Sequence, residues 1–194
     1  GIPDGVVSII TGDEKNCAIP LTTHPDIDRI AFTGGPKVAK QIVINSSENF
    51  AVTTLELGGK SPIVVFEDAD IEGAVNGIIA GNYGASGQSC VAGTRVIVHD
   101  SIKKVLVEML SKRAESIVTG DPKNNDTHVG PLCTNKQIKL IEKTLKKAQS
   151  QGAKIVFGGS RLNQKGYYFE PTLIDCTNES IVSLETEMFG PVAS

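Results

Sequence analysis

The sequence has few of the residues that build metal centres and disulfide frameworks. It contains only three histidines, and its four cysteines are far apart without any CxxC pair: Cys17, Cys90, Cys133 and Cys176. We therefore expect no metal site. Because disulfides persist in oxidising compartments, widely spaced cysteines favour a reducing cytoplasm as the location of the protein.

The sequence also lacks a charge bias and a long apolar run. Its formal net charge is −3, so no nucleic-acid partner is expected, since such partners require a basic surface. Apolar runs are short and interrupted by glycine, as around residues 78–80, which predicts no membrane-spanning segment. The first residues lack the basic start and apolar stretch of a signal peptide. With 40% hydrophobic and 21% charged residues, the chain is expected to bury a core.

Hydrophobic periodicity predicts alternating strands and helices. Short apolar runs predict strands at residues 6–10, 26–32, 51–57, 63–66, 96–99, 154–157 and 171–176. Apolar residues at helical spacing predict helices at 13–21, 36–43, 70–82, 101–118 and 135–150. Pro36 suits the first turn of its helix, and Asp70 and Ser101 are predicted N-caps. This alternation indicates a parallel α/β fold.

Residues 84–95 place one cysteine in a loop of small residues, Gly-Ala-Ser-Gly-Gln-Ser-Cys-Val-Ala-Gly-Thr-Arg. Gly87 and Gly93 stand three positions to either side of Cys90. Small residues at this density leave room for a substrate to approach the backbone, whereas a packed core would fill the space with branched side chains. The loop alone leaves two interpretations open: a nucleophile, or a small buried cysteine in a turn.

A second informative stretch is Leu-Glu-Leu-Gly-Gly-Lys-Ser-Pro at residues 55–62. A carboxylate between two leucines at the end of an apolar strand is costly unless it is paired or functional. Glu56 also stands at the carboxyl end of a strand, where α/β folds build their sites. The alternative is a glutamate on the solvated face of an edge strand. Glu56 precedes Cys90 by 34 residues (90 − 56).

Seven motifs follow one another along the chain. They are Phe32-Thr33-Gly34, residues 55–62, Gly87-Gln88-Ser89-Cys90, Gly130-Pro131, Gly158-Gly159, residues 168–172 and residues 187–192. In this order, and over nearly the whole chain, they resemble the NAD(P)-dependent aldehyde dehydrogenase superfamily. The resemblance implies an α/β fold with a parallel-sheet, Rossmann-like remnant followed by an α/β catalytic domain. Residues 1–57 would be the C-terminal part of the NAD(P)-binding domain, and residues 58–194 a catalytic domain truncated at its C-terminus.

The resemblance also implies roles for the two singled-out side chains. Cys90 would attack an aldehyde as a thiolate, and its backbone N–H would form half of an oxyanion hole. Glu56 would be the general base that activates the water for thioester hydrolysis. The product would be a carboxylic acid. The implied substrate is a small-molecule aldehyde, and the implied assembly is a homodimer or homotetramer of the full-length protein.

The same resemblance implies a dinucleotide cofactor, NAD or NADP, with NAD favoured. Glu187 would accept the nicotinamide ribose hydroxyls, and Phe189 would pack beside that ribose and ring. The turn at Gly34 and Gly35 would place a helix N-terminus toward the pyrophosphate. Leu57 and Gly58 complete the expected cofactor-binding set. The plainer alternatives are that Glu187 is one of several surface acids, with Glu179 and Glu185, and that Phe189 belongs to the core.

The sequence departs from the family pattern at several positions, which points to substrate preference, and other functions also stay open. Gly35 stands where the family usually has serine, Ala39 where glycine is common, and Ala85 where the family has asparagine. A CoA-acylating semialdehyde dehydrogenase is one alternative, although a retained Glu56 disfavours it. Another is a catalytically incomplete structural module, since this partial chain alone is expected to be inactive. A thiol redox protein is disfavoured because Cys90 has no nearby resolving cysteine in the sequence.

Overall fold

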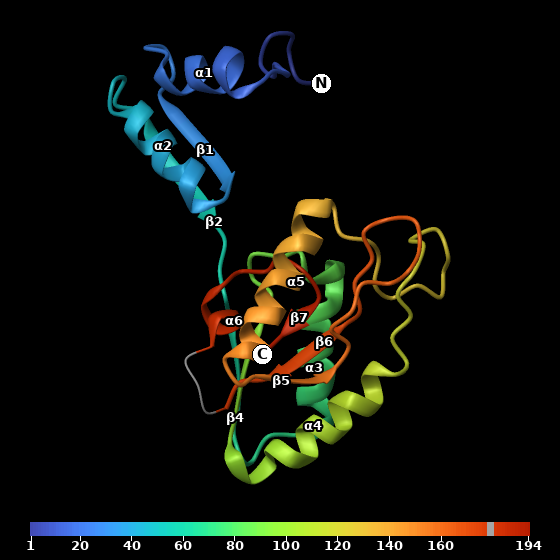
Figure 1. Cartoon of the computed structure of the whole chain (residues 1–194). Helices are drawn as coiled ribbons and strands as arrows, with labels where there is room; N and C mark the ends of the chain where they lie inside the picture. Colours follow the sequence, from blue (N-terminus) through green and yellow to red (C-terminus); the bar gives the residue numbers. More distant parts are fainter. Residues whose placement is uncertain (178–180) are drawn as a thin grey trace. The chain divides into compact units, whose positions relative to one another are not determined.

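Two bodies make up the computed structural model, which describes residues 1–177 and 181–194. One comprises Gly1–Gly58 and the other Gly59–Ser194. Figure 1 shows the helices and strands of each. None of the helices in the described ranges is long and apolar enough to cross a membrane.

The first body is a strand–helix–strand unit preceded by short helical turns. A π-helical turn, Glu14–Ala18, continues into α1 (Ile19–Thr23), followed by β1 (Arg29–Gly34), α2 (Pro36–Ser46) and β2 (Val52–Leu57). β1 and β2 pair in parallel. Gly35 is the N-cap of α2, which puts Pro36 at the first helical position as predicted.

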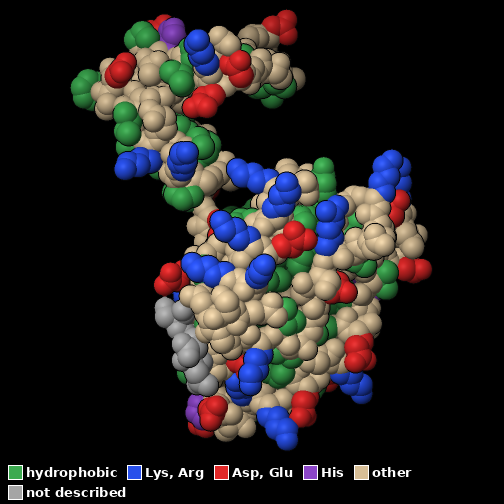
Figure 2. All heavy atoms as spheres, in the orientation of Figure 1, with side chains coloured by type: hydrophobic (Ala, Val, Ile, Leu, Met, Phe, Trp, Pro, Cys, Tyr) green, Lys and Arg blue, Asp and Glu red, His purple; other side chains and the backbone are tan. Residues whose placement is uncertain are grey.

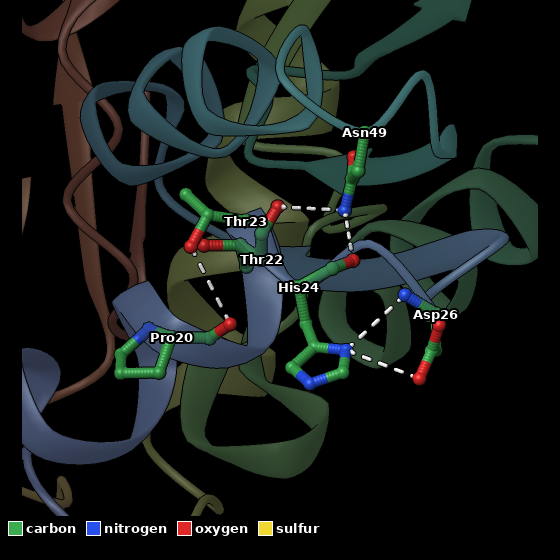
Figure 3. A network of polar contacts seen from close by, with 6 residues as sticks. All are labelled: Pro20, Thr22, Thr23, His24, Asp26 and Asn49. Carbon is green, nitrogen blue, oxygen red and sulfur yellow. Dashed lines mark hydrogen bonds and ion pairs between the residues drawn. The ribbon is translucent and has the colours of Figure 1, made fainter.

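A network of polar contacts connects segments of this body that are distant in sequence (Figure 3). The side-chain amide of Asn49 donates to the carbonyl oxygens of His24 at 2.7 Å and Thr22 at 3.4 Å. The Nδ1 atom of His24 accepts the backbone N–H of Asp26 at 3.1 Å. These bonds tie the end of α1 to the turn that precedes β2.

The predicted strand at residues 6–10 is wrong. This segment has no regular secondary structure, and its side chains face solvent, with Ile9 89% exposed. β1 pairs with β2, and no other strand among the described residues offers this run backbone partners. An apolar run without such partners cannot form a ladder.

The second body contains the remaining elements. In chain order they are β3 (Pro62–Val65), α3 (Ile71–Tyr83), a 3₁₀ turn η2 (Gly84–Gly87), β4 (Arg95–Val98), α4 (Asp100–Ala114), α5 (Asn135–Ser150), β5 (Lys154–Phe157), β6 (Thr172–Asp175), α6 (Val182–Glu185) and β7 (Val192–Ala193). β3 pairs with β4, and β6 with β7, in parallel; β5 pairs with β6 in antiparallel. The predicted α/β class with parallel sheets is confirmed.

Ser194 joins the two sheets of this body. It follows β7 directly; its N–H donates to the Thr94 carbonyl at 3.0 Å, and its own carbonyl accepts the Val96 N–H at 2.7 Å. The chain therefore pairs with β6 along β7 and, one residue later, with the backbone at the start of β4.

Helices cover both faces of these strands because the side chains of β6 and β7 alternate. Leu173 and Ala193 pack with α3 and α4, whereas Ile174 and Val192 pack with α5. The outer surface of α5 carries five exposed lysines: Lys136, Lys139, Lys143, Lys146 and Lys147. Figure 2 shows Lys and Arg side chains gathered over this region.

One of the two predicted N-caps is confirmed. The Asp70 carboxylate accepts the backbone N–H groups of Glu72 and Gly73, both at 3.2 Å, at the start of α3. The Ser101 prediction is wrong because α4 begins one residue earlier, with His99 as its N-cap. The Ser101 hydroxyl instead bonds to His99 Nδ1 at 2.8 Å.

Candidate functional site

The Cys90 loop leaves α3 through three consecutive residues with left-handed backbone. Ala85, Ser86 and Gly87 have φ angles of 49°, 56° and 69°. For Ala85 and Ser86 this conformation costs about 1–2 kcal/mol each, so other contacts must hold it. Cys90 follows in a turn, half-buried and with a free thiol.

Contacts with distant segments hold this loop in place. The Ser86 hydroxyl donates to the Gly130 carbonyl at 3.0 Å. The Gln88 side-chain oxygen accepts the Cys133 N–H, also at 3.0 Å. Gly87 packs so tightly that a Cβ there would lie 2.2 Å from the Gly190 carbonyl oxygen. The motifs around Cys90, Gly130 and Gly190 therefore meet in one place.

Glu187 lies in the same region of the second body. Its Oε1 atom accepts the backbone N–H of Gly59 at 3.1 Å. Gly59 is itself close to the Cys90 loop, because a Cβ there would lie 3.2 Å from the Cys90 carbonyl oxygen. Glu187 is half-buried and hydrogen-bonded, unlike the exposed Glu185; Glu179 lies outside the described residues.

Phe189 follows in a left-handed conformation, with φ of 48°, and is 39% exposed. The Gln137 side-chain amide, on α5, donates to the carbonyl oxygen of the preceding residue, Met188. The ring of Phe189 is therefore presented at the surface of this body rather than packed in its core.

The predicted site residues of the first body lie at the carboxyl ends of its two parallel strands. Gly34 is paired with Leu57, and Thr33 with Glu56. Glu56 is exposed, and Leu57 is half-buried. Gly35 caps α2 without a side-chain hydrogen bond. Pro36 has no N–H and the Val38 N–H donates to the Gly35 carbonyl at 3.2 Å, which leaves the Lys37 N–H of the first turn for an acceptor. Gly58 is exposed at the end of this body.

Lys60 is a residue that the sequence analysis did not single out. Its Nζ atom is buried and has no hydrogen-bond partner among the described residues. Burial, together with the nearby Arg95 guanidinium, lowers the pKa of Lys60 to about 8. The Arg95 Nε donates to the Lys60 carbonyl at 2.6 Å. The only sequence signal was a lysine two residues before a strand that begins at proline.

Other features of the second body lie apart from these residues. A cavity of about 310 Å³ between β4, α4 and β6 is lined by none of the predicted site residues. In the part of the chain that the structure describes, no group of three or more His, Cys, Asp or Glu side chains could hold a metal ion.

Comparisons with known proteins identify similar chains. A sequence model described as the aldehyde dehydrogenase family matches residues 1–194. The (Z)-2-((N-methylformamido)methylene)-5-hydroxybutyrolactone dehydrogenase of Acinetobacter baylyi is 48% identical over 195 residues, covering 100% of this chain and 40% of that protein. The chloroplastic betaine aldehyde dehydrogenase of Atriplex hortensis is 40% identical over 194 residues, which cover 99% of this chain and 39% of that protein.

The solved structures give the same picture. A double mutant of the Staphylococcus aureus betaine aldehyde dehydrogenase, in complex with NAD+, superposes with a TM-score of 0.93 at 36% identity. The match covers 100% of this chain and 39% of that one. The chain thus spans about two fifths of the length of the relatives that it matches.

Proposed function

Because the chain belongs to the aldehyde dehydrogenase family, we propose that the protein that carries it oxidises an aldehyde to a carboxylic acid with NAD(P)+. The observation that supports this most directly is the meeting of the Cys90 loop with the segment of Glu187. Gly87 and Gly190 touch through their backbones, and Glu187 is anchored on Gly59. NAD+ is the favoured cofactor, since the similar Staphylococcus aureus enzyme binds it.

In the proposed reaction, the Cys90 thiolate adds to the aldehyde carbon and forms a hemithioacetal. The Cys90 backbone N–H stabilises the developing oxyanion. NAD+, when bound, accepts the hydride that leaves this carbon, and a thioester remains on Cys90. Glu56 then takes a proton from water, the water attacks the thioester, and the carboxylic acid leaves while the thiolate is restored.

The residues proposed to hold the cofactor have groups free for this task. Glu187 uses Oε1 for Gly59, so its second oxygen can accept a ribose hydroxyl. The Lys37 N–H and the positive end of the helix dipole at the start of α2 suit a phosphate. The exposed ring of Phe189 can pack against a flat ring. The full proposed set is Gly34, Gly35, Leu57, Gly58, Glu187 and Phe189. In this assignment residues 1–57 serve the cofactor and residues 58–194 carry the nucleophile.

The test compares Cys90→Ser with Cys133→Ser, a control at an exposed cysteine near the same loop. In the protein that carries this chain, Cys90→Ser should abolish both aldehyde-dependent formation of NADH and cofactor-free cleavage of an activated ester. Cys133→Ser should retain both activities. Hydride transfer by Cys90→Ser near the wild-type rate would rule out Cys90 as the nucleophile.

The same assays separate the alternatives. A CoA-acylating enzyme would form NADH in proportion to added CoA and would release an acyl-CoA. A module without catalytic activity would leave the activated ester intact even with an accessible Cys90 thiol.

A further inference from the structure

The backbone before Cys90 is strained and needs support. Ala85 and Ser86 have φ angles of 49° and 56°, a region that residues other than glycine rarely adopt. Gln88 follows with φ of −92° and ψ of 60°, which belongs neither to a helix nor to a strand. Such conformations persist only where surrounding contacts hold them. The contacts of this segment therefore decide how the chain enters Cys90.

Two side chains of the strained segment bind one distant stretch, residues 130–133. The Ser86 side chain is buried, and its hydroxyl donates to the Gly130 carbonyl at 3.0 Å. The Gln88 side chain is half-buried, and its oxygen accepts the Cys133 N–H at 3.0 Å. We call these two side-chain hydrogen bonds the clasp. One bond uses a side-chain donor and the other a side-chain acceptor, so the clasp fixes the segment at two points.

The stretch that receives the clasp is itself fixed. Leu132 is buried, and its N–H donates to the Tyr167 carbonyl at 2.8 Å. On the other side of Cys90, the Gly93 N–H donates to the Gly81 carbonyl at 3.2 Å. The chain around Cys90 is thus supported before the cysteine by the clasp and after it by a backbone hydrogen bond.

Between these supports, Cys90 is the second residue of a tight turn. The turn is closed by the Ala92 N–H, which donates to the Ser89 carbonyl at 3.2 Å. A turn of this kind uses the N–H of its fourth residue and leaves that of its second residue free. The Val91 N–H donates to the Ser89 hydroxyl oxygen at 3.4 Å, whereas nothing among the described residues accepts the Cys90 N–H. This N–H is therefore available to an oxygen atom of a ligand, and its direction follows the orientation of the turn.

We infer that Ser86 and Gln88 are positioning residues for Cys90. Their clasp orients the turn so that the free Cys90 N–H meets the oxyanion that forms when the thiolate attacks a carbonyl carbon. This inference rests on the proposed function, in which Cys90 is the nucleophile. Without the clasp the turn loses two of its supports and shifts, while the thiol stays accessible. A small shift suffices, because a displacement of about 1 Å can lower a rate about 100-fold.

Two reactions of Cys90 separate the orientation of its N–H from the reactivity of its thiol. In acylation by p-nitrophenyl acetate, the thiolate adds to the carbonyl carbon, an oxyanion forms, and p-nitrophenolate leaves while the acetyl group stays on sulfur. In alkylation by iodoacetamide, the thiolate displaces iodide and no oxyanion forms. Both rates are measured in the protein that carries this chain, by the burst of p-nitrophenolate and by mass spectrometry of the peptide that contains Cys90.

Variants of Gln88 test the clasp directly. Gln88→Met keeps the length of the side chain but lacks the amide oxygen, so acylation should slow about 30- to 100-fold while alkylation changes less than about threefold. Gln88→Glu keeps an acceptor oxygen. Its charge lowers the thiolate fraction, but the ratio of acylation to alkylation cancels that fraction and should stay within about threefold of the wild type. Gln164→Met, at an exposed glutamine outside the clasp, is the control and should match the wild type in both reactions.

The outcomes separate this inference from the proposed function. If Cys90→Ser releases p-nitrophenolate at the wild-type rate, the nucleophile assignment fails, and the inference fails with it. If Cys90→Ser is inactive while Gln88→Met is acylated near the wild-type rate, the inference alone is wrong. An equal loss of acylation and alkylation in Gln88→Met also overturns it, because the clasp would then act on the thiol. If Gln88→Met does not fold, Ser86→Ala decides by the same criteria, with an expected fall of at least about tenfold in the ratio of acylation to alkylation.

Discussion

Gly87 is the residue at which the absence of a side chain matters most for the site. A Cβ there would lie 2.2 Å from the Gly190 oxygen and 2.7 Å from the Pro191 nitrogen, and its φ of 69° disfavours other residues. Gly87→Ala should therefore push the Cys90 loop from the segment of Glu187 and destabilise the fold by about 2 kcal/mol. The measurements are ester cleavage and thermal unfolding. Gly84→Ala is the matched control, because it has no atom within 4 Å of the new Cβ; equal losses in the two variants would contradict the prediction.

Lys60 links stability to pH in the direction opposite to that of a lysine whose pKa is raised by a partner. Its folded pKa of about 8 lies below the ordinary value of 10.5, so the unfolded chain binds more protons between these values. The contribution of Lys60 to stability should therefore rise with pH from about 8 to about 10.5. Lys60→Met should raise the free energy of unfolding at pH 7 by at most about 3 kcal/mol, and the gain should shrink above pH 8. Chemical denaturation at several pH values checks this. A variant less stable than the wild type at pH 7 would contradict the prediction.

At the scale of elements, α3 delivers the chain to the Cys90 loop, and Asp70 caps its start. Because the carboxylate accepts two N–H groups at the helix N-terminus, Asp70→Ala should cost about 1 kcal/mol of stability. Asp68→Ala, an exposed change in the preceding turn, is the control and should be nearly neutral. Urea denaturation of both variants measures the difference. A cost shared by both would assign the effect to local charge rather than to the cap.

Elements held by contacts between residues close in sequence could be predicted, whereas those held by distant segments could not. α3 and α5 have apolar residues at helical spacing, and the sequence predicts both. The apolar run at residues 6–10 resembles a strand in sequence but pairs with no strand of the described part of the chain. The left-handed residues before Cys90 were not predicted, because distant segments such as Gly130 and Gly190 hold them.

For the molecule as a whole, the sequence alone could not place the candidate site. Glu187 and Gly59 are 128 residues apart, and no local pattern joins them. Only the resemblance to a family linked the motifs in advance. The burial of Lys60 could not be predicted, because the cost of burying an amine depends on what surrounds it in the folded chain.

The two bodies should differ in resistance to local opening, because their cores differ. The three clusters of buried apolar side chains found among the described residues all lie within Gly59–Ser194. In Gly1–Gly58 the buried apolar residues are Ala39, Ile42 and Ala51, and a groove of about 1090 Å³ borders α1, β1 and α2. Helix formation alone stabilises a segment little, so protection requires a packed apolar face.

Hydrogen exchange followed by mass spectrometry measures this difference directly. Amides of α5, whose Ile138, Ile141 and Leu145 are buried, should exchange at least about tenfold more slowly than those of α2. α2 is the matched comparison because it is also a helix of several turns, with 11 residues against 16. Equal protection of the two helices would mean that Gly1–Gly58 gains stability from packing beyond its own small core.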